Sequence, residues 1–204
     1  MTWSRATVGL LLMMLLATAC GNPSNSPGWL VTTYYTAVES LHSGPFTRVI
    51  GCLRLDCQNG HDDLGYYPAD FVRAVHDEGT GRITNGRYAG MYLNWSAGVG
   101  YWLDTAARDA YGHPLQRFRT AAADGLAKGT AVRLSSCGYV DNGKPPATEV
   151  CARLRAPTWV INDSFTPGSG GSYHIDLYIG EETGSGIRSS PLYTTLHNAV
   201  LSIG

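Results

Sequence analysis

Short strand-like runs separated by turn residues are the feature that most constrains the fold of this chain. Stretches rich in β-branched and aromatic side chains recur along it, and each is bounded by Gly, Pro, Asn or Ser. They cover residues 29–38, 82–95, 118–123, 131–134, 158–162 and 173–179. Many short strands at irregular spacing, with few helical segments between them, are typical of a small closed β-barrel. The sequence therefore predicts one mainly β domain over residues 29–204.

One helix is predicted inside this domain, and a second is possible near its end. Pro68 stands at a first-turn position, residues 71–75 place three apolar side chains on one face, and Gly79 provides a stop. In the tail, residues 190–191 (Ser-Pro) could begin a short helix, whereas residues 199–203 could form a closing strand. The domain is thus expected to carry one or two short helices.

The N-terminus has the order of a secretory signal. Arg5 supplies a positive charge, residues 8–16 form an apolar run, and small residues lead to Cys20. The run is too short for a permanent bilayer span, which takes about 20 apolar residues. We therefore expect residues 1–20 to direct export and residues 21–28 to form a flexible tether.

The end of this signal adds a second expectation. Residues 16–20 (Leu-Ala-Thr-Ala-Cys) resemble the lipobox of bacterial lipoproteins, in which the cysteine is lipidated. The protein is expected in the cell envelope, either anchored to the membrane by a lipid on Cys20 or secreted after ordinary cleavage nearby. With 15 basic and 16 acidic side chains, it has no bulk charge that would favour binding to nucleic acid.

Four further cysteines are expected to form two disulfides. An even number of cysteines in an exported chain favours local pairs, Cys52 with Cys57 and Cys137 with Cys151. The alternative is a four-cysteine metal site, but neither pair has the Cys-x2-Cys spacing of structural zinc.

Three aspartates stand out as candidates for acid–base chemistry. Asp124 follows an apolar triplet, Asp163 ends an apolar run, and Asp176 lies inside a strand-like segment where it shares a face with His174 and Tyr178. A carboxylate in such surroundings is costly unless it is paired or protonated, and a raised pKa is what a general acid needs at neutral pH. The structural alternative is that each aspartate only caps a turn or accepts backbone hydrogen bonds.

Several segments resemble a known family, in the family's own order. They are 33–39 (Thr-Tyr-Tyr-Thr-Ala-Val-Glu), 78–82 (Glu-Gly-Thr-Gly-Arg) with 85–87, 122–124 with 128–132, 159–163 (Trp-Val-Ile-Asn-Asp) and 175–178 (Ile-Asp-Leu-Tyr). Together they resemble the three-aspartate double-psi β-barrel domain of the membrane-bound lytic transglycosylase A family. Segment 78–82 is similar to the family's Gln-Gly-Ser-Gly stretch. The resemblance implies a six-stranded double-psi β-barrel with a lid or small lobe inserted at about residues 44–101.

The same resemblance implies a function and its residues. The family cleaves peptidoglycan glycan strands without water, giving 1,6-anhydro products in cell-wall turnover, and uses no cofactor or metal. The catalytic acid matches Asp176, with Asp163 as its supporting carboxylate. A monomer that binds glycan strands is expected, and the following residues are expected to support catalysis or bind substrate: Asp124, Tyr34, Glu39, Ser164, His174, Tyr178 and Trp95.

Two observations keep an alternative open. The loop after Asp163 is about two residues longer than the family's and lacks its lysine. Aromatic residues in segment 92–102 could stack on sugar rings, with Trp95 favoured for sugar and Trp102 for the core. The alternative is therefore a non-catalytic wall-binding module similar to expansins. In an enzyme, Asp163 and Asp176 should meet at the floor of an open groove.

A metal-dependent peptidase is a further candidate with less support. It would use His174 and Asp176, with His61 and Asp62 or Asp63 supplying the remaining zinc ligands.

Overall fold

The computed structural model describes residues 24–184 and 186–204. The expected signal, the lipidation site at Cys20 and residues 21–23 of the expected tether lie outside the described residues. Within them the chain is mainly β, as predicted. The strands are β1 (Ser24–Val38), β2 (Phe46–Gly51), β3 (Asp62–Pro68), β4 (Thr80–Arg82), β5 (Tyr92–Ser96), β6 (Gly100–Asp104), β7 (Thr120–Ala122), β8 (Ala131–Ser136), β9 (Trp159–Asp163), β10 (His174–Glu181) and β11 (Leu196–Ile203). The helices are α1 (Ala69–Glu78) and α2 (Thr148–Arg155), with short 3-10 turns at Glu39–Leu41, Gly86–Tyr88 and Ile187–Ser189.

Six of these strands close into a barrel, which confirms the predicted fold class. Around the ring the order is β1, β10, β7, β9, β8 and β11, and β11 returns to β1. The pairs β1–β10 and β7–β9 are parallel, and the other pairs are antiparallel. Alternate side chains point inward and fill the interior with large apolar groups, including Trp159, Ile161, Ile175 and Leu177, all essentially buried.

The first strand is longer than expected and takes up part of the predicted tether. Residues 24–28, which we expected to be flexible, pair with β11, with Ser24 opposite Ile203. That part of the tether prediction is wrong, because Trp29 is buried and anchors the start of the strand to the core. The ambiguous tail forms β11 over Leu196–Ile203, so the closing-strand alternative is the one observed.

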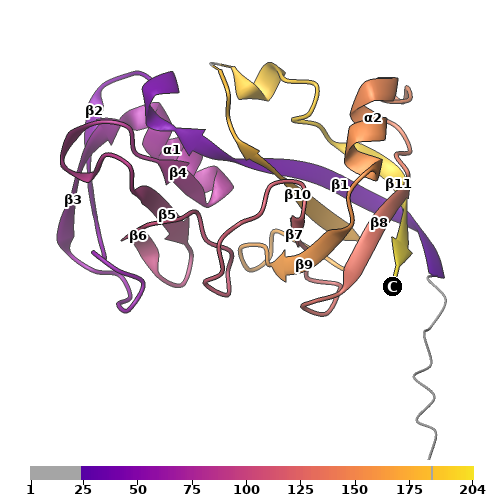
Figure 1. Ribbon diagram of the computed structural model, residues 1–204, viewed down its shortest axis with the longest axis horizontal. Helices are drawn as coiled ribbons and strands as arrows, with labels where there is room; N and C mark the ends of the chain where they lie inside the picture. The colour runs from indigo at the N-terminus through magenta and orange to yellow at the C-terminus, as the bar shows by residue number, and fades with distance from the viewer. Residues whose placement is uncertain (1–23, 185) are drawn as a thin grey trace, which may run out of the picture.

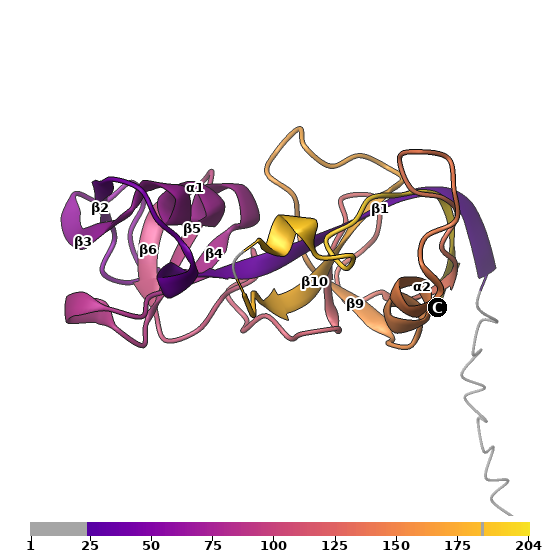
Figure 2. The same ribbon diagram turned by 90° about the horizontal axis from the view of Figure 1, so that it is seen from above.

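The segment at about residues 44–101 forms a small second lobe beside the barrel. Strands β4, β5 and β6 continue the sheet from the C-terminal end of β1, where Ala37 pairs with Gly81. Strands β2 and β3 make a separate antiparallel ribbon. Figures 1 and 2 show this lobe at one end, the barrel at the other, and β1 running through both.

Helix α1 packs inside this lobe as its sequence predicts. Phe71, Val72 and Val75 are buried, and the helix ends at Gly79 with a φ of 87°, a left-handed conformation that favours glycine. Gly81 allows the helix to approach β4, because a Cβ there would lie 2.5 Å from Val75 Cγ2. The lobe is thereby fixed against the strand that it shares with the barrel.

Both predicted disulfides are present. Cys52 and Cys57 close a short loop in the small lobe, with Cα atoms 5.8 Å apart. Cys137 and Cys151 join the segment after β8 to α2, with Cα atoms 5.9 Å apart. Within the described residues, no helix has the length and apolar character needed to cross a membrane.

Candidate active site

The two predicted catalytic carboxylates lie on either side of one small residue. In β7, Ala122 pairs with Asp163 of β9 on one side and with Asp176 of β10 on the other. Residues directly opposite on neighbouring strands share a face of the sheet. Because strands are spaced by about 4.8 Å, the two Cα atoms lie roughly 10 Å apart across the methyl group of Ala122.

An open groove of about 430 Å³ runs over this row of residues. From the barrel it is lined by Tyr34, Ala122, Asp176 and the loop that follows Asp163. From the small lobe it is lined by the end of α1 and by the turn between β5 and β6. The groove therefore lies between the barrel and the lobe, with both carboxylates among its lining residues.

Asp163 is the better satisfied of the two carboxylates. The Tyr34 hydroxyl donates to Oδ2 at 2.8 Å, and the backbone N–H groups of Ala110 and Ser164 donate to Oδ1 at 2.8 and 2.9 Å. Burial raises the pKa of Asp163 to about 6, and these three donors oppose that rise because they favour the charged form. Asp163 is therefore suited to carry a negative charge.

Asp176 has an environment that favours the proton. Its Oδ1 is buried without a hydrogen-bond partner among the described residues. Burial raises the pKa of Asp176 to about 7, and the charge of Asp163 adds to the rise, whereas a hydrogen bond from Thr32 opposes it. Thr32 lies directly opposite Asp176 on β1. The two carboxyls of this groove therefore favour different protonation states: Asp163 the charged form and Asp176 the protonated form.

Three other predicted residues also lie at this groove. Tyr34 reaches it through its hydroxyl, Ser164 through the loop after Asp163, and Trp95 from the lobe side, where its ring lies 4.1 Å from that of His76. Trp102, expected in the core, is 4% exposed and is also among the residues that line the groove.

The structure places four predicted residues outside the groove: His174, Tyr178, Asp124 and Glu39. His174 contacts the Thr32 hydroxyl with Nε2 at 2.9 Å, and Tyr178 is buried, with its hydroxyl 2.6 Å from that of Thr36. Asp124 is exposed and accepts from the backbone of Phe165 at 3.3 Å, which ties down the loop after β9. None of these side chains lines the groove.

Glu39, expected to support catalysis or bind substrate, does not line the groove. Its carboxylate is buried and accepts backbone N–H groups from Thr84 and Asn85 at 2.7 and 2.9 Å. It therefore fixes the chain after β4 rather than facing a ligand.

Two contributors to the groove were not predicted from the sequence. Ala110 acts through its backbone N–H, which any residue but proline can supply, so no side-chain signal marks it. Glu78 ends α1 and is among the residues that line the groove. A sequence signal for Glu78 did exist: it stands at the position where the family's Gln-Gly-Ser-Gly stretch has glutamine.

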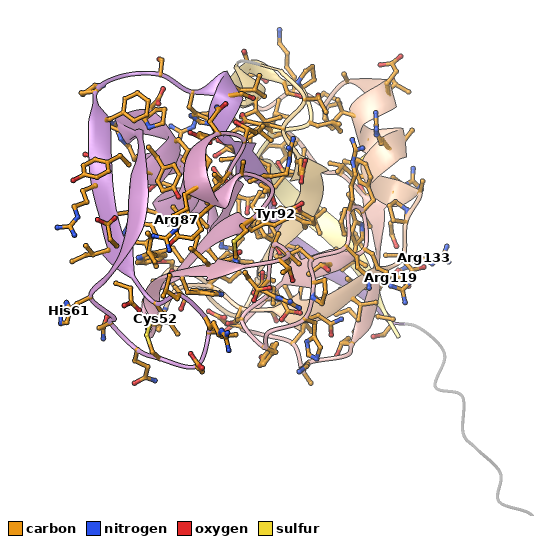
Figure 3. The ribbon with its side chains drawn as sticks, turned by 60° about the vertical axis from the view of Figure 1, so that its left-hand side comes forward. Cys52, His61, Arg87, Tyr92, Arg119 and Arg133 are labelled. Atoms are coloured by element: carbon orange, nitrogen blue, oxygen red, sulfur yellow. A yellow bond between two sulfur atoms is a disulfide. The ribbon has the colours of Figure 1, made fainter. Side chains whose placement is uncertain are left out.

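The expected zinc ligands of the peptidase alternative do not come together. Figure 3 labels His61 at the outer edge of the small lobe, whereas Asp176 lies in barrel strand β10. Among the residues that the structure describes, His, Cys, Asp and Glu side chains form no group of three that could hold a metal ion.

Solved structures share this architecture. The chain has the fold of the MltA lytic transglycosylases, with a closed barrel and a second lobe beside it. In particular, Escherichia coli MltA with bound chitohexaose matches with a TM-score of 0.59 and 16% identity, over 88% of this chain and 71% of that one. The membrane-bound lytic murein transglycosylase of Agrobacterium tumefaciens matches with a TM-score of 0.53 and 12% identity, over 89% of this chain and 76% of that one.

At these identities the likeness is one of fold. No protein-family model matches the sequence, and the search of curated proteins found no sequence match.

Proposed function

We propose that this protein is a lytic transglycosylase that cleaves the glycan strands of peptidoglycan to 1,6-anhydro products. One observation carries the proposal: a buried carboxyl with an oxygen that has no partner among the described residues, Asp176, shares the floor of an open groove with a carboxylate that accepts three hydrogen bonds from the protein, Asp163. The fold similarity to lytic transglycosylases, one of them with a bound chitohexaose, supports the same substrate class.

The geometry suits a reaction in which one residue serves as acid and then as base. Protonated Asp176 donates its proton to the glycosidic oxygen as the C1–O bond breaks, and the leaving sugar departs as an alcohol. The resulting carboxylate accepts the proton of the 6-hydroxyl as O6 attacks C1 of the same sugar, which closes the anhydro ring. The proton is thus returned to Asp176, and no water is consumed.

Asp163 supports both steps through its charge. Its three hydrogen-bond donors favour the ionised form, which raises the pKa of Asp176 and stabilises positive charge at the anomeric carbon. The ionised carboxylate is held by Tyr34 and two backbone groups, so it is positioned as an electrostatic partner rather than as a nucleophile.

The experiment compares the purified protein with its Asp176→Asn form on isolated peptidoglycan, with products analysed by mass spectrometry. We expect anhydro-muropeptides from the wild type and a loss of at least about a thousandfold in the variant, because general acid–base catalysis contributes on that order. Asp62→Asn is the matched control, since Asp62 is an exposed aspartate of β3 outside the groove, and it should keep its activity. Products with ordinary reducing ends from the wild type would contradict the non-hydrolytic reaction.

A second candidate, a non-catalytic wall-binding module, is favoured by one observation. Asp163 Oδ1 accepts two backbone N–H groups, which is the structural use of an aspartate expected in a binder. If neither form releases product while both sediment with peptidoglycan, this second function replaces the first.

We also propose that the protein works in the cell envelope. The two disulfides support this location, because such bonds persist in oxidising compartments and not in a reducing cytosol.

A further inference from the structure

Residues 109–113, in the segment that connects β6 to β7, form a tight turn around the carboxylate of Asp109. Its Oδ1 accepts the backbone N–H groups of Tyr111 and His113, both at 2.9 Å, and its Oδ2 lies 3.3 Å from Nδ1 of His113. The backbone N–H of Asp109 donates to the carbonyl of His113 at 2.9 Å, and the N–H of Gly112 donates to the carbonyl of Asp109 at 3.0 Å. These bonds use every backbone N–H group of the turn but one.

The remaining N–H group, that of Ala110, points out of the turn and donates to Asp163 Oδ1 at 2.8 Å. Asp109 and Ala110 both belong to the residues that line the groove. The Asp109 side chain is only 1% exposed, and a carboxylate so deeply buried is costly unless it is hydrogen-bonded. Its bonds within the turn meet that need, and they also fix the direction of the one N–H group that the turn does not use.

The small lobe holds this turn in place. Asn94 of β5 is fully buried, and its Oδ1 accepts the backbone N–H of Arg108 at 3.2 Å. The Arg108 guanidinium donates to Asp104 Oδ1 at the end of β6 at 2.6 Å, and to the carbonyl of Gly112 at 3.2 Å. The turn is therefore attached to the lobe on both sides of its tip, and it reaches from there to a carboxylate of the barrel.

Asp109 acts on Asp163 in two opposite ways. Its charge raises the pKa of Asp163, whereas the Ala110 N–H that its turn delivers lowers that pKa. Tyr34 also donates to Asp163 from β1, and Asp176 on β10 shares the floor of the groove. The other titratable or charged side chains that line the groove are those of His76, Asp77, Glu78 and Arg108. The charge of Asp109 and the turn that it forms can be separated by substitution, because asparagine keeps the acceptor oxygen and loses the charge.

We propose that Asp109 is a positioning residue of the active site, which orders the turn that delivers the Ala110 N–H to Asp163. Asp163 is thereby held in place beside Asp176 by a donor that comes from the small lobe side of the groove. The effect on Asp163 is a property of the protein alone, whereas its importance for catalysis rests on the proposed function. The small lobe then takes part in the reaction through a backbone group, and not only as a wall of the groove.

The first test follows the ionisation of Asp163 by NMR, with 13C-labelled aspartate and pH as the variable. Asp176→Asn serves as the background, so that the two carboxyls do not titrate together. In that background Asp109→Asn should lower the pKa of Asp163, because the charge is lost while the turn is kept. Asp109→Ala loses the charge and the turn, so the pKa of Asp163 should lie about one pH unit above its value in the Asp109→Asn form.

The second test measures the release of anhydro products from soluble peptidoglycan fragments, with the same substitutions in the otherwise unchanged protein. Asp109→Asn should keep kcat within about twofold, whereas Asp109→Ala should lower kcat about tenfold with little change in KM, the effect of one lost hydrogen bond at a charged group. Asp62→Asn, at an exposed aspartate of β3 outside the groove, is the control for the loss of one acidic residue.

The outcomes separate this inference from the one on which it rests. Equal pKa values for Asp163 in the Asp109→Asn and Asp109→Ala forms, or equal losses of kcat in the two, would overturn the positioning role. If the pKa values differ as expected but even the wild type releases no anhydro products, the proposed function fails and the ordering of Asp163 by Asp109 stands. If Asp109→Ala does not fold, Asp109→Ser replaces it, because a serine hydroxyl forms the same turn more weakly and should also raise the pKa of Asp163 above that of the Asp109→Asn form.

Discussion

Replacing Asp176 with asparagine should make the protein more stable while it removes the proposed activity. Burial raises the pKa of Asp176 from an ordinary 3.8 to about 7, so the folded state holds a proton that the unfolded chain releases near pH 4. A group whose folded pKa is raised stabilises the fold below its unfolded pKa and loses that contribution as pH rises through the folded value. The free energy of unfolding of the wild type should therefore fall as pH rises and Asp176 ionises. The asparagine variant has no carboxyl at this position and should not show that fall.

The magnitude follows from the size of the shift. Each pKa unit corresponds to about 1.36 kcal/mol, so an ionised Asp176 costs up to about 4 kcal/mol. Part of that cost is already present at pH 5, and between pH 5 and pH 8 it grows by about 2 to 3 kcal/mol. The contributions of Asp163 and Glu78 are present in both proteins and largely cancel in the comparison.

The assay is urea unfolding followed by tryptophan fluorescence at pH 5, 6, 7 and 8. The free energy of unfolding of Asp176→Asn minus that of the wild type should increase by about 2 to 3 kcal/mol over this range. Asp62→Asn, at an exposed aspartate outside the groove, should show a difference that stays within about 0.5 kcal/mol, as for most surface substitutions. A constant difference for Asp176→Asn across the range would refute the argument that Asp176 is held protonated by burial.

Two further changes probe the same structure. Tyr34→Phe removes a donor to Asp163, so the pKa of Asp163 should rise and the acid limb of kcat/KM on peptidoglycan should move up by about one pH unit; an unmoved limb would argue against this hydrogen bond. The Cys137→Ser/Cys151→Ser double variant opens a loop of about 15 residues and should lower the free energy of unfolding by about 3 kcal/mol in urea. Its activity should persist, since no residue of α2 lines the groove; equal stability would contradict the estimate.

The barrel could be predicted from the sequence because its strands leave a local pattern. Residues 158–162 contain the apolar triplet Trp-Val-Ile, and residues 173–179 place apolar side chains between His174 and Asp176 and after them; these segments lie in strands β9 and β10. Strand β2 was missed because it faces solvent on one side: Phe46 and Ile50 are exposed, and only Val49 and Gly51 are buried. A ribbon with so little buried surface has a weak sequence pattern. Helix α2 was missed for a similar reason, since it is short and buries only two residues.

The site was predictable where the chain places a carboxyl inside an apolar strand, as it does for Asp163 and Asp176. It was not predictable where function depends on groups brought together by the fold. Glu78 follows a helical pattern in the sequence, and only the packing of α1 beside the barrel places it among the residues that line the groove. Glu39 shows the reverse, because a carboxylate next to the opening motif proved to be engaged by backbone amides.

Strand β1 has a consequence for how the protein opens. Its first part is paired with β10 and β11 in the barrel, and its last residues are paired with β4 in the small lobe. Amide hydrogens in the middle of this strand can exchange with solvent only when barrel pairing is broken, and the N–H of Val38 at its end only when its hydrogen bond to Glu182 is broken. The two lobes should therefore unfold as one cooperative unit, with the slowest-exchanging amides of both in β1. The width of the groove between them is then a property of the whole molecule rather than of a hinge.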